Sequence, residues 1–140
     1  MLGQTGVEYL MLFTLVLTIL SILTYYAQDM TQRNMEEIIV SGATIAVNKI
    51  VDASDIVYTQ GKPSQVSLSV YVPDKVYSIE FSNNRMIMRI NISSGSSDIF
   101  ATSKAQLKGN ISTISGTKKI RVKAEKNVTT GVTYVNITEG

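Results

Sequence analysis

The longest hydrophobic pattern lies near the start of the chain. No charged residue occurs between Glu8 and Asp29, and residues 9–28 are rich in Leu, Ile, Val, Met and Thr. With a rise of about 1.5 Å per residue, such a run forms a helix about 30 Å long, the thickness of the hydrocarbon core of a bilayer. The run is longer than the hydrophobic region of a secretory signal, and no small-residue cleavage pattern follows it. It predicts a retained membrane-length helix with the carboxylate of Glu8 at its edge, where lipid makes an unpaired charge costly.

Beyond Asp29 the pattern becomes amphipathic. Apolar residues recur at alternating steps of four and three positions, which is typical of the seam of one continuous helix. The seam consists of Met35, Ile39, Ala43, Ala46, Ile50, Ala53 and Val57. Gly42 lies within it, either to allow close packing or as a flexible point. The acidic residues Asp52 and Asp55 are expected on the polar side of the helix.

Gly61 and Pro63 supply the stop signal, so one helix is expected over residues 4–60. Its first part, 4–28, is hydrophobic, and its second part, 29–60, is amphipathic and packs on the remainder of the chain. A helix of this length, about 80 Å, cannot be covered by the small domain that follows it. Its first part must therefore be buried in lipid or in other chains.

After Pro63 the period of the pattern changes to two, which predicts strands. The alternating runs are residues 66–72, 76–81, 85–92, 118–124 and 132–138, with weaker candidates at 98–102 and 106–115 and a Gly/Ser loop at 93–97. Six or seven short strands separated by turn residues favour a small antiparallel β-sandwich or barrel. The expected class is α+β, with a long N-terminal helix and a β-rich head over residues 61–140.

Composition narrows the classes of function. The 140 residues carry a net charge of +2 and include no cysteine and no histidine. Disulfides therefore cannot stabilise the head, and the commonest general base and metal ligand are missing. No phosphate-binding loop or nucleophile motif occurs, so no catalytic residue, cofactor or metal is expected, and the chain is not expected to be an enzyme.

The segment 104–126 is basic, with Glu125 as its one acidic residue. A patch for nucleic acid or another anionic surface is one interpretation. A solvated strand face is favoured, because aromatic residues do not interleave with these charges. Nucleic acid is therefore not expected as a partner.

The N-terminal motif carries a resemblance to a known family. Gly3-Gln4-x-Gly6-x-Glu8-Tyr9-Leu10, followed by an uncharged run, resembles the class III signal of archaeal type IV pilins. The resemblance implies cleavage by a prepilin peptidase between Gly3 and Gln4. It also implies that Glu8 accepts the α-ammonium group of Gln4 from an adjacent subunit during assembly. Such leaders usually carry Lys or Arg, which Met1-Leu2-Gly3 lacks. Either residues 1–3 are the remnant of a leader, or the mature chain begins at Met1; we favour Gln4.

Asn-x-Ser/Thr motifs mark candidate glycosylation sites. The motif occurs at Asn91, Asn110, Asn127 and Asn136, all in the head. Roughly two would be expected by chance from eight asparagines in a Ser/Thr-rich chain. These residues are either turn-forming asparagines or, in an exported protein, carriers of N-glycans.

The expected function is that of a structural subunit of an extracellular archaeal type IV pilus-like filament. The resemblance implies a helical homo-oligomer that serves adhesion at the cell surface, with the assembly machinery as a partner and the cytoplasmic membrane as the location before assembly. One alternative is an archaellin or a minor pilin of a related filament. Another is a single-pass membrane-anchored ectodomain that binds a partner. Glu8 and the Gly3-Gln4 junction distinguish a filament subunit from a plain anchor, which needs neither.

Overall fold

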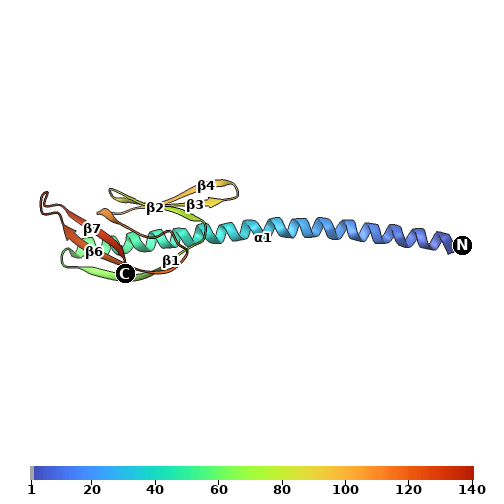
Figure 1. The fold of residues 1–140 in the computed structure, drawn as a ribbon, viewed down its shortest axis with the longest axis horizontal. Helices are drawn as coiled ribbons and strands as arrows, with labels where there is room; N and C mark the ends of the chain where they lie inside the picture. Colours follow the sequence, from blue (N-terminus) through green and yellow to red (C-terminus); the bar gives the residue numbers. More distant parts are fainter. Residues whose placement is uncertain (1) are drawn as a thin grey trace. The chain divides into compact units, whose positions relative to one another are not determined.

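A computed structural model describes the backbone of residues 2–140 and the side chains from Gly6 onward. One helix, α1 (Leu2–Gln60), precedes all the strands (Figure 1). The strands are β1 (Gln65–Val72), β2 (Val76–Ser82), β3 (Arg85–Ile92), β4 (Gly95–Thr102), β5 (Gln106–Asn110), β6 (Gly116–Lys126) and β7 (Thr133–Glu139). The expected α+β class, with a long N-terminal helix and a β-rich head, is confirmed.

The chain divides into two compact units. The first unit is Met1–Glu37 and the second is Ile38–Gly140, so the division falls within α1. It falls later than the end of the uncharged run at residue 28, because residues 29–35 are as exposed as those before them. The second unit contains the rest of α1 and every strand, and its core is described below.

The strands form two open sheets rather than a closed barrel. Four strands pair in the order β1-β6-β7-β5, and three pair in the order β2-β3-β4. All neighbours are antiparallel except β5 and β7, which are parallel. The expectation of a purely antiparallel head was therefore wrong for β5. This short strand returns to the edge of the first sheet beside β7, a neighbour that local alternation does not reveal.

One hydrophobic core joins α1 to both sheets. In Figure 1 the part of α1 from Ile38 onward runs between β2-β3-β4 and the strands β1, β6 and β7. The expected seam is buried from Ala43 to Val57, whereas Ile39 is partly buried and Met35 is 62% exposed. The buried face also includes Val47, Val51 and Ser54. It is wider than a single seam because the core includes residues of two sheets.

The strand patterns follow the expected alternation in the second sheet. Met86, Met88 and Ile90 of β3 are fully buried. The difference lies at β4, which begins at Gly95 within the segment expected to be a loop. Gly95 to Thr102 pair in continuous register with β3. Pairing with a well-formed neighbour therefore overrides the low strand preference of the Gly-Ser-Ser sequence.

Asp55 fixes the connection between the two sheets rather than facing solvent as expected. Its carboxylate accepts a hydrogen bond from the Ser103 hydroxyl (2.5 Å) and another from the backbone N–H of Lys104 (2.8 Å). The same hydroxyl accepts a hydrogen bond from the N–H of Ala105 (3.1 Å). Ser103 is buried, so these bonds satisfy polar groups that would otherwise destabilise the core.

Gly42 lies beside the turn that follows β1. A β-carbon added at Gly42 would lie 3.9 Å from Cβ of Pro73, which is ordinary van der Waals contact. Pro73 is buried and follows β1, and the space beside it would accept an alanine at position 42 without a shift of this turn. The helix α1 continues through Gly42 without a break, so the structure shows neither a kink at this residue nor a packing contact that only glycine allows.

Candidate functional site

The apolar helix of the first unit is exposed around its whole circumference. None of the most hydrophobic window of the helix is buried. The large apolar side chains from Val7 to Met30 range from 47% exposed at Leu17 to 79% at Tyr9. By length and composition this helix can cross a membrane. A helix that is apolar on every side is stable only when lipid or other helices shield it from water.

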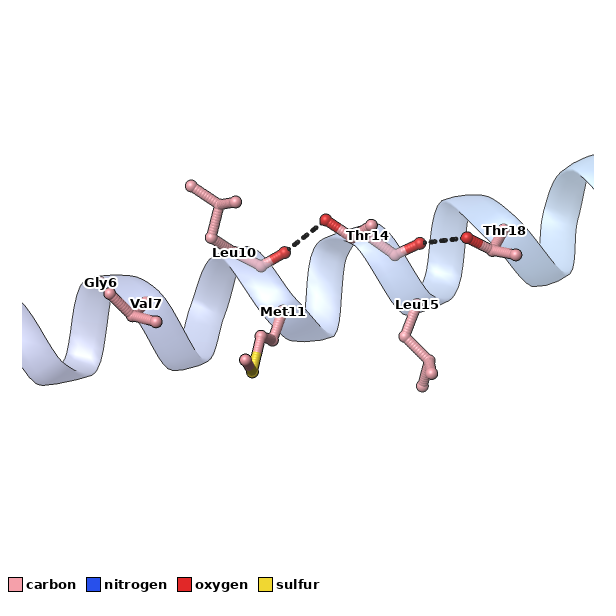
Figure 2. Close-up of a pocket in the computed structure, with 7 residues that line it drawn as sticks. All are labelled: Gly6, Val7, Leu10, Met11, Thr14, Leu15 and Thr18. Atoms are coloured by element: carbon pink, nitrogen blue, oxygen red, sulfur yellow. Dashed lines mark hydrogen bonds between the residues drawn. The ribbon is translucent and has the colours of Figure 1, made fainter.

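The hydroxyl groups within this segment need no partner from outside the helix. The side chains of Thr14, Thr18, Ser21 and Thr24 each donate a 2.8 Å hydrogen bond to the carbonyl oxygen four residues earlier. Figure 2 shows the first two of these bonds, from Thr14 to Leu10 and from Thr18 to Thr14. Because these donors are satisfied, the hydroxyls do not oppose transfer of the segment into an apolar environment.

A shallow, largely apolar hollow lies along one side of this helix. It is lined by Gly6, Val7, Leu10, Met11, Thr14, Leu15 and Thr18, all labelled in Figure 2. No side-chain atom of another residue lies within 4 Å of the position that a β-carbon on Gly6 would occupy. A hollow between larger side chains accepts a ridge of side chains from a second helix. The geometry therefore suits helix-helix packing rather than a small-molecule ligand.

Glu8 is exposed in the first unit, one position before the uncharged run. Within residues 6–140 no hydrogen bond or ion pair to its carboxylate is present. Met1 lies outside the described residues, and only the backbone of Gly3 and Gln4 is described. The structure therefore places Glu8 on the apolar helix, while cleavage at Gly3-Gln4 and the contact between Gln4 and Glu8 stay predictions.

The four glycosylation motifs occupy different environments. Asn127 lies in the β6–β7 connection, where its side-chain oxygen accepts a hydrogen bond from the N–H of Thr129 (2.9 Å). Asn91 is exposed on β3, and Asn110 is exposed at the end of the edge strand β5. Asn136 is half-buried on the inner strand β7, and its amide nitrogen donates to Glu125 (3.4 Å).

Two carboxylates of the first sheet are held in their charged form. The hydroxyl of Tyr134 donates to Glu125 (2.9 Å), and this bond lowers the pKa of the Glu125 carboxyl. At the other end of β7, the Lys118 ammonium (2.7 Å) and the backbone N–H of Ser112 (3.0 Å) lower the pKa of Glu139. These bonds join neighbouring segments of the sheet, and we assign them structural roles.

The sequence interpretation recognised a basic strand face within residues 104–126 but missed the aromatic residues that lie on it. Lys119, Arg121 and Lys123 alternate with buried residues on β6, so their side chains share the outer face of the four-stranded sheet. The strand register places Tyr71 of β1 and Tyr134 of β7 on the same face of the sheet as these three cations. Aromatic residues thus reach this face from distant parts of the chain. Only the strand order could have revealed them.

No family model matches the chain, and no curated protein or solved structure matches it either. Within residues 6–140, no group of three or more acidic side chains is placed to hold a metal ion. The exposed apolar helix is therefore the feature from which a function must be argued.

Proposed function

We propose that this chain is a structural subunit of an extracellular archaeal type IV pilus-like filament, in which the apolar helices bundle into a core. The observation that carries the proposal is the complete exposure of an apolar helix in a single chain. Burying each large apolar side chain contributes about 1.5–3 kcal/mol, so more than ten of them favour association strongly. Identical helices supply that burial once the segment has left the lipid.

Glu8 supports a filament rather than a plain membrane anchor. A carboxylate beside an apolar run is costly in lipid or in a helix bundle unless a cation pairs with it. Lys and Arg are both missing from residues 1–28, so the chain supplies only an amino terminus as a nearby cation. When Gln4 is the first residue, its α-ammonium group in one subunit pairs with Glu8 of the next and sets the register between them.

Three exposed isoleucines in the second unit carry no separate argument for contacts between subunits. Ile38, Ile45 and Ile56 of α1 are 69%, 57% and 52% exposed. Their separations of seven and eleven residues both correspond to nearly whole numbers of helical turns, so they lie on one side of the helix. Lys49 and Asp52 lie on the same side between Ile45 and Ile56, so these isoleucines are singly exposed side chains of the kind that is normal on a protein surface.

The alternative within the family is an archaellin or a minor pilin, which would share this helix and this head. The alternative from another class is a single-pass anchored ectodomain that binds a partner. It is favoured by Tyr9 at one end of the apolar run and Tyr25 and Tyr26 at the other, because tyrosines gather at both faces of a bilayer. The filament proposal accommodates the same residues, since the subunit resides in the membrane before assembly.

The two functions are separated by recovering the protein from the cell surface. We expect shearing to release filaments visible by electron microscopy and made of this chain. Their intact mass should correspond to a start at Gln4, because of the Gly3-Gln4 junction. Recovery of the chain only as membrane-bound monomers would favour the anchored ectodomain. A start at Met1 would refute the assignment of the cleavage site. Filament formation is decided separately, by the electron micrographs.

Glycosylation of the exported protein is a further expectation. We expect glycans on at least two of Asn91, Asn110, Asn127 and Asn136, with Asn127 occupied before Asn136. Both side chains are half-buried, but Asn127 lies in the β6–β7 connection and is bonded through its oxygen, whereas the amide nitrogen of Asn136 already donates to Glu125 within the sheet. Mass spectrometry of peptides before and after deglycosylation measures the occupancy. Unmodified peptides covering all four sites would contradict the expectation.

A further inference from the structure

The four-stranded sheet presents a row of cations to solvent. Lys119, Arg121 and Lys123 are exposed on β6, an inner strand, at intervals of about 6.8 Å. Lys108 of β5 extends the row sideways, because Lys123 lies opposite Asn136 and Asn136 lies opposite Lys108. The result is a flat patch of four positive side chains, which we call the basic face.

The charge of the basic face is largely uncompensated. Glu125 is the one acidic residue on this side of the sheet, and it lies 3.4 Å from the Lys123 ammonium. Lys119 and Arg121 form no ion pair within the part of the chain that the structure describes.

The three-stranded sheet differs, because its cations are balanced. There Arg89 lies 2.6 Å from Glu80 and 3.6 Å from Asp98. Both carboxylates raise the pKa of the Arg89 guanidinium. Positive charge is thus segregated onto one sheet, and a net charge of +2 for the whole chain conceals it.

Uncharged hydrogen-bonding groups surround these cations. The strand register places hydroxyl and amide side chains on the same face as the basic row. They are Gln65, Ser67, Ser69, Asn110, Asn136 and Thr138. One row across the sheet runs Ser67, Arg121, Thr138, Asn110. A polymer that carries both negative charges and many hydroxyl groups would find a partner for each kind of group.

Two other partners fit this face less well. Single-stranded nucleic acid needs aromatic rings on which bases stack, but the Tyr134 ring is covered by the Lys108 ammonium (5.0 Å) and its hydroxyl is bound to Glu125. Tyr71 lies on the edge strand β1, at the margin of the face. A second copy of the chain offers fewer free carboxylates, since Glu80 and Asp98 of the three-stranded sheet already pair with Arg89.

We propose that the basic face binds an anionic polysaccharide. Lys119, Arg121 and Lys123 face its carboxylate or sulfate groups, and Lys108 on the neighbouring part of the sheet provides a further positive charge. The neighbouring hydroxyl and amide side chains hydrogen-bond the sugar hydroxyls. The proposal is independent of filament formation, because the whole face belongs to one chain. In a filament the site would repeat along the polymer, and multivalency would raise the apparent affinity without any new contact.

Binding is tested with the full-length chain in a non-ionic detergent, produced in a host without N-glycosylation so that Asn110 and Asn136 are bare. The probes are sulfated dextran, polygalacturonate, neutral dextran and a thymidine oligonucleotide. We expect sulfated dextran, polygalacturonate or both to bind at low salt and neutral dextran not to bind. The double variant Lys119→Gln/Arg121→Gln should bind at least tenfold more weakly and with a smaller dependence on salt.

The matched control removes two exposed cations elsewhere, in Lys49→Gln/Arg85→Gln, and its affinity should stay within twofold of the parent. Circular dichroism checks that both double variants fold. Equal losses in the two variants would show that only net charge matters, and would overturn the site. The proposal also fails when neither anionic polysaccharide binds. It fails equally when the oligonucleotide binds as tightly as the polysaccharides, since the face would then be a general polyanion surface.

Discussion

The substitution Glu8→Ala is expected to abolish filaments while the protein still accumulates in the membrane. The apolar run after Glu8 is unchanged, so insertion into lipid is retained. Removing the carboxylate leaves the α-ammonium group of an incoming subunit without a partner in an apolar environment, which is strongly unfavourable. Counting filaments by electron microscopy and measuring the protein in membrane fractions test the two parts of this expectation separately.

The control is a substitution that weakens cohesion without touching the charge. Leu17→Ala should still assemble, because one of many apolar side chains is shortened, but its filaments should dissociate at lower temperature or detergent concentration. Glu8 is expected to control registry and assembly rather than bulk cohesion. Filaments of Glu8→Ala at the parent's level would refute the ion pair. Polymerisation of a chain lacking residues 1–28 would refute the helical core itself.

Local patterns predicted most of the elements, and the start of β4 within an expected loop is the main exception. The uncharged run and the following seam predict one helix, and α1 ends at Gln60, immediately before the stop signal at Gly61. Gly61 has a positive φ of 73°, a backbone conformation that glycine adopts without strain. Alternation located β3 at Arg85–Ile92 with its methionines inward.

Long-range pairing was not predictable in the same way. Nothing local to residues 106–110 indicates that β5 lies parallel to β7. The width of the buried face of α1 depends on two sheets, whereas a heptad pattern describes only one seam. The basic face needs the order β1-β6-β7-β5 before its residues can be recognised as neighbours. Each of these features is set by which strands meet, and strand order is a property of the whole fold.

The substitution Gly109→Ala is expected to destabilise the head severely, and it tests this strand order directly. A β-carbon at Gly109 would lie 2.1 Å from the carbonyl oxygen of Ile137 and 2.9 Å from its carbonyl carbon. Both atoms belong to the backbone of β7, which is held on its other side by β6, so the strand cannot move away cheaply. Overpacking costs about 1–3 kcal/mol, and we expect the upper end of this range because the clashing atoms belong to the backbone.

The same chemical change at Gly42 provides the matched control. A β-carbon there meets only Pro73 at 3.9 Å, and alanine is preferred over glycine in a helix, so Gly42→Ala should stabilise by about 0.5–1 kcal/mol. Denaturant unfolding of the full chain in non-ionic detergent, followed by near-ultraviolet circular dichroism of its tyrosines, measures both changes. Hydrogen exchange should also accelerate first in β5 and β7 of Gly109→Ala. Equal stability of the two variants would mean that β5 and β7 do not approach as closely as their parallel pairing requires.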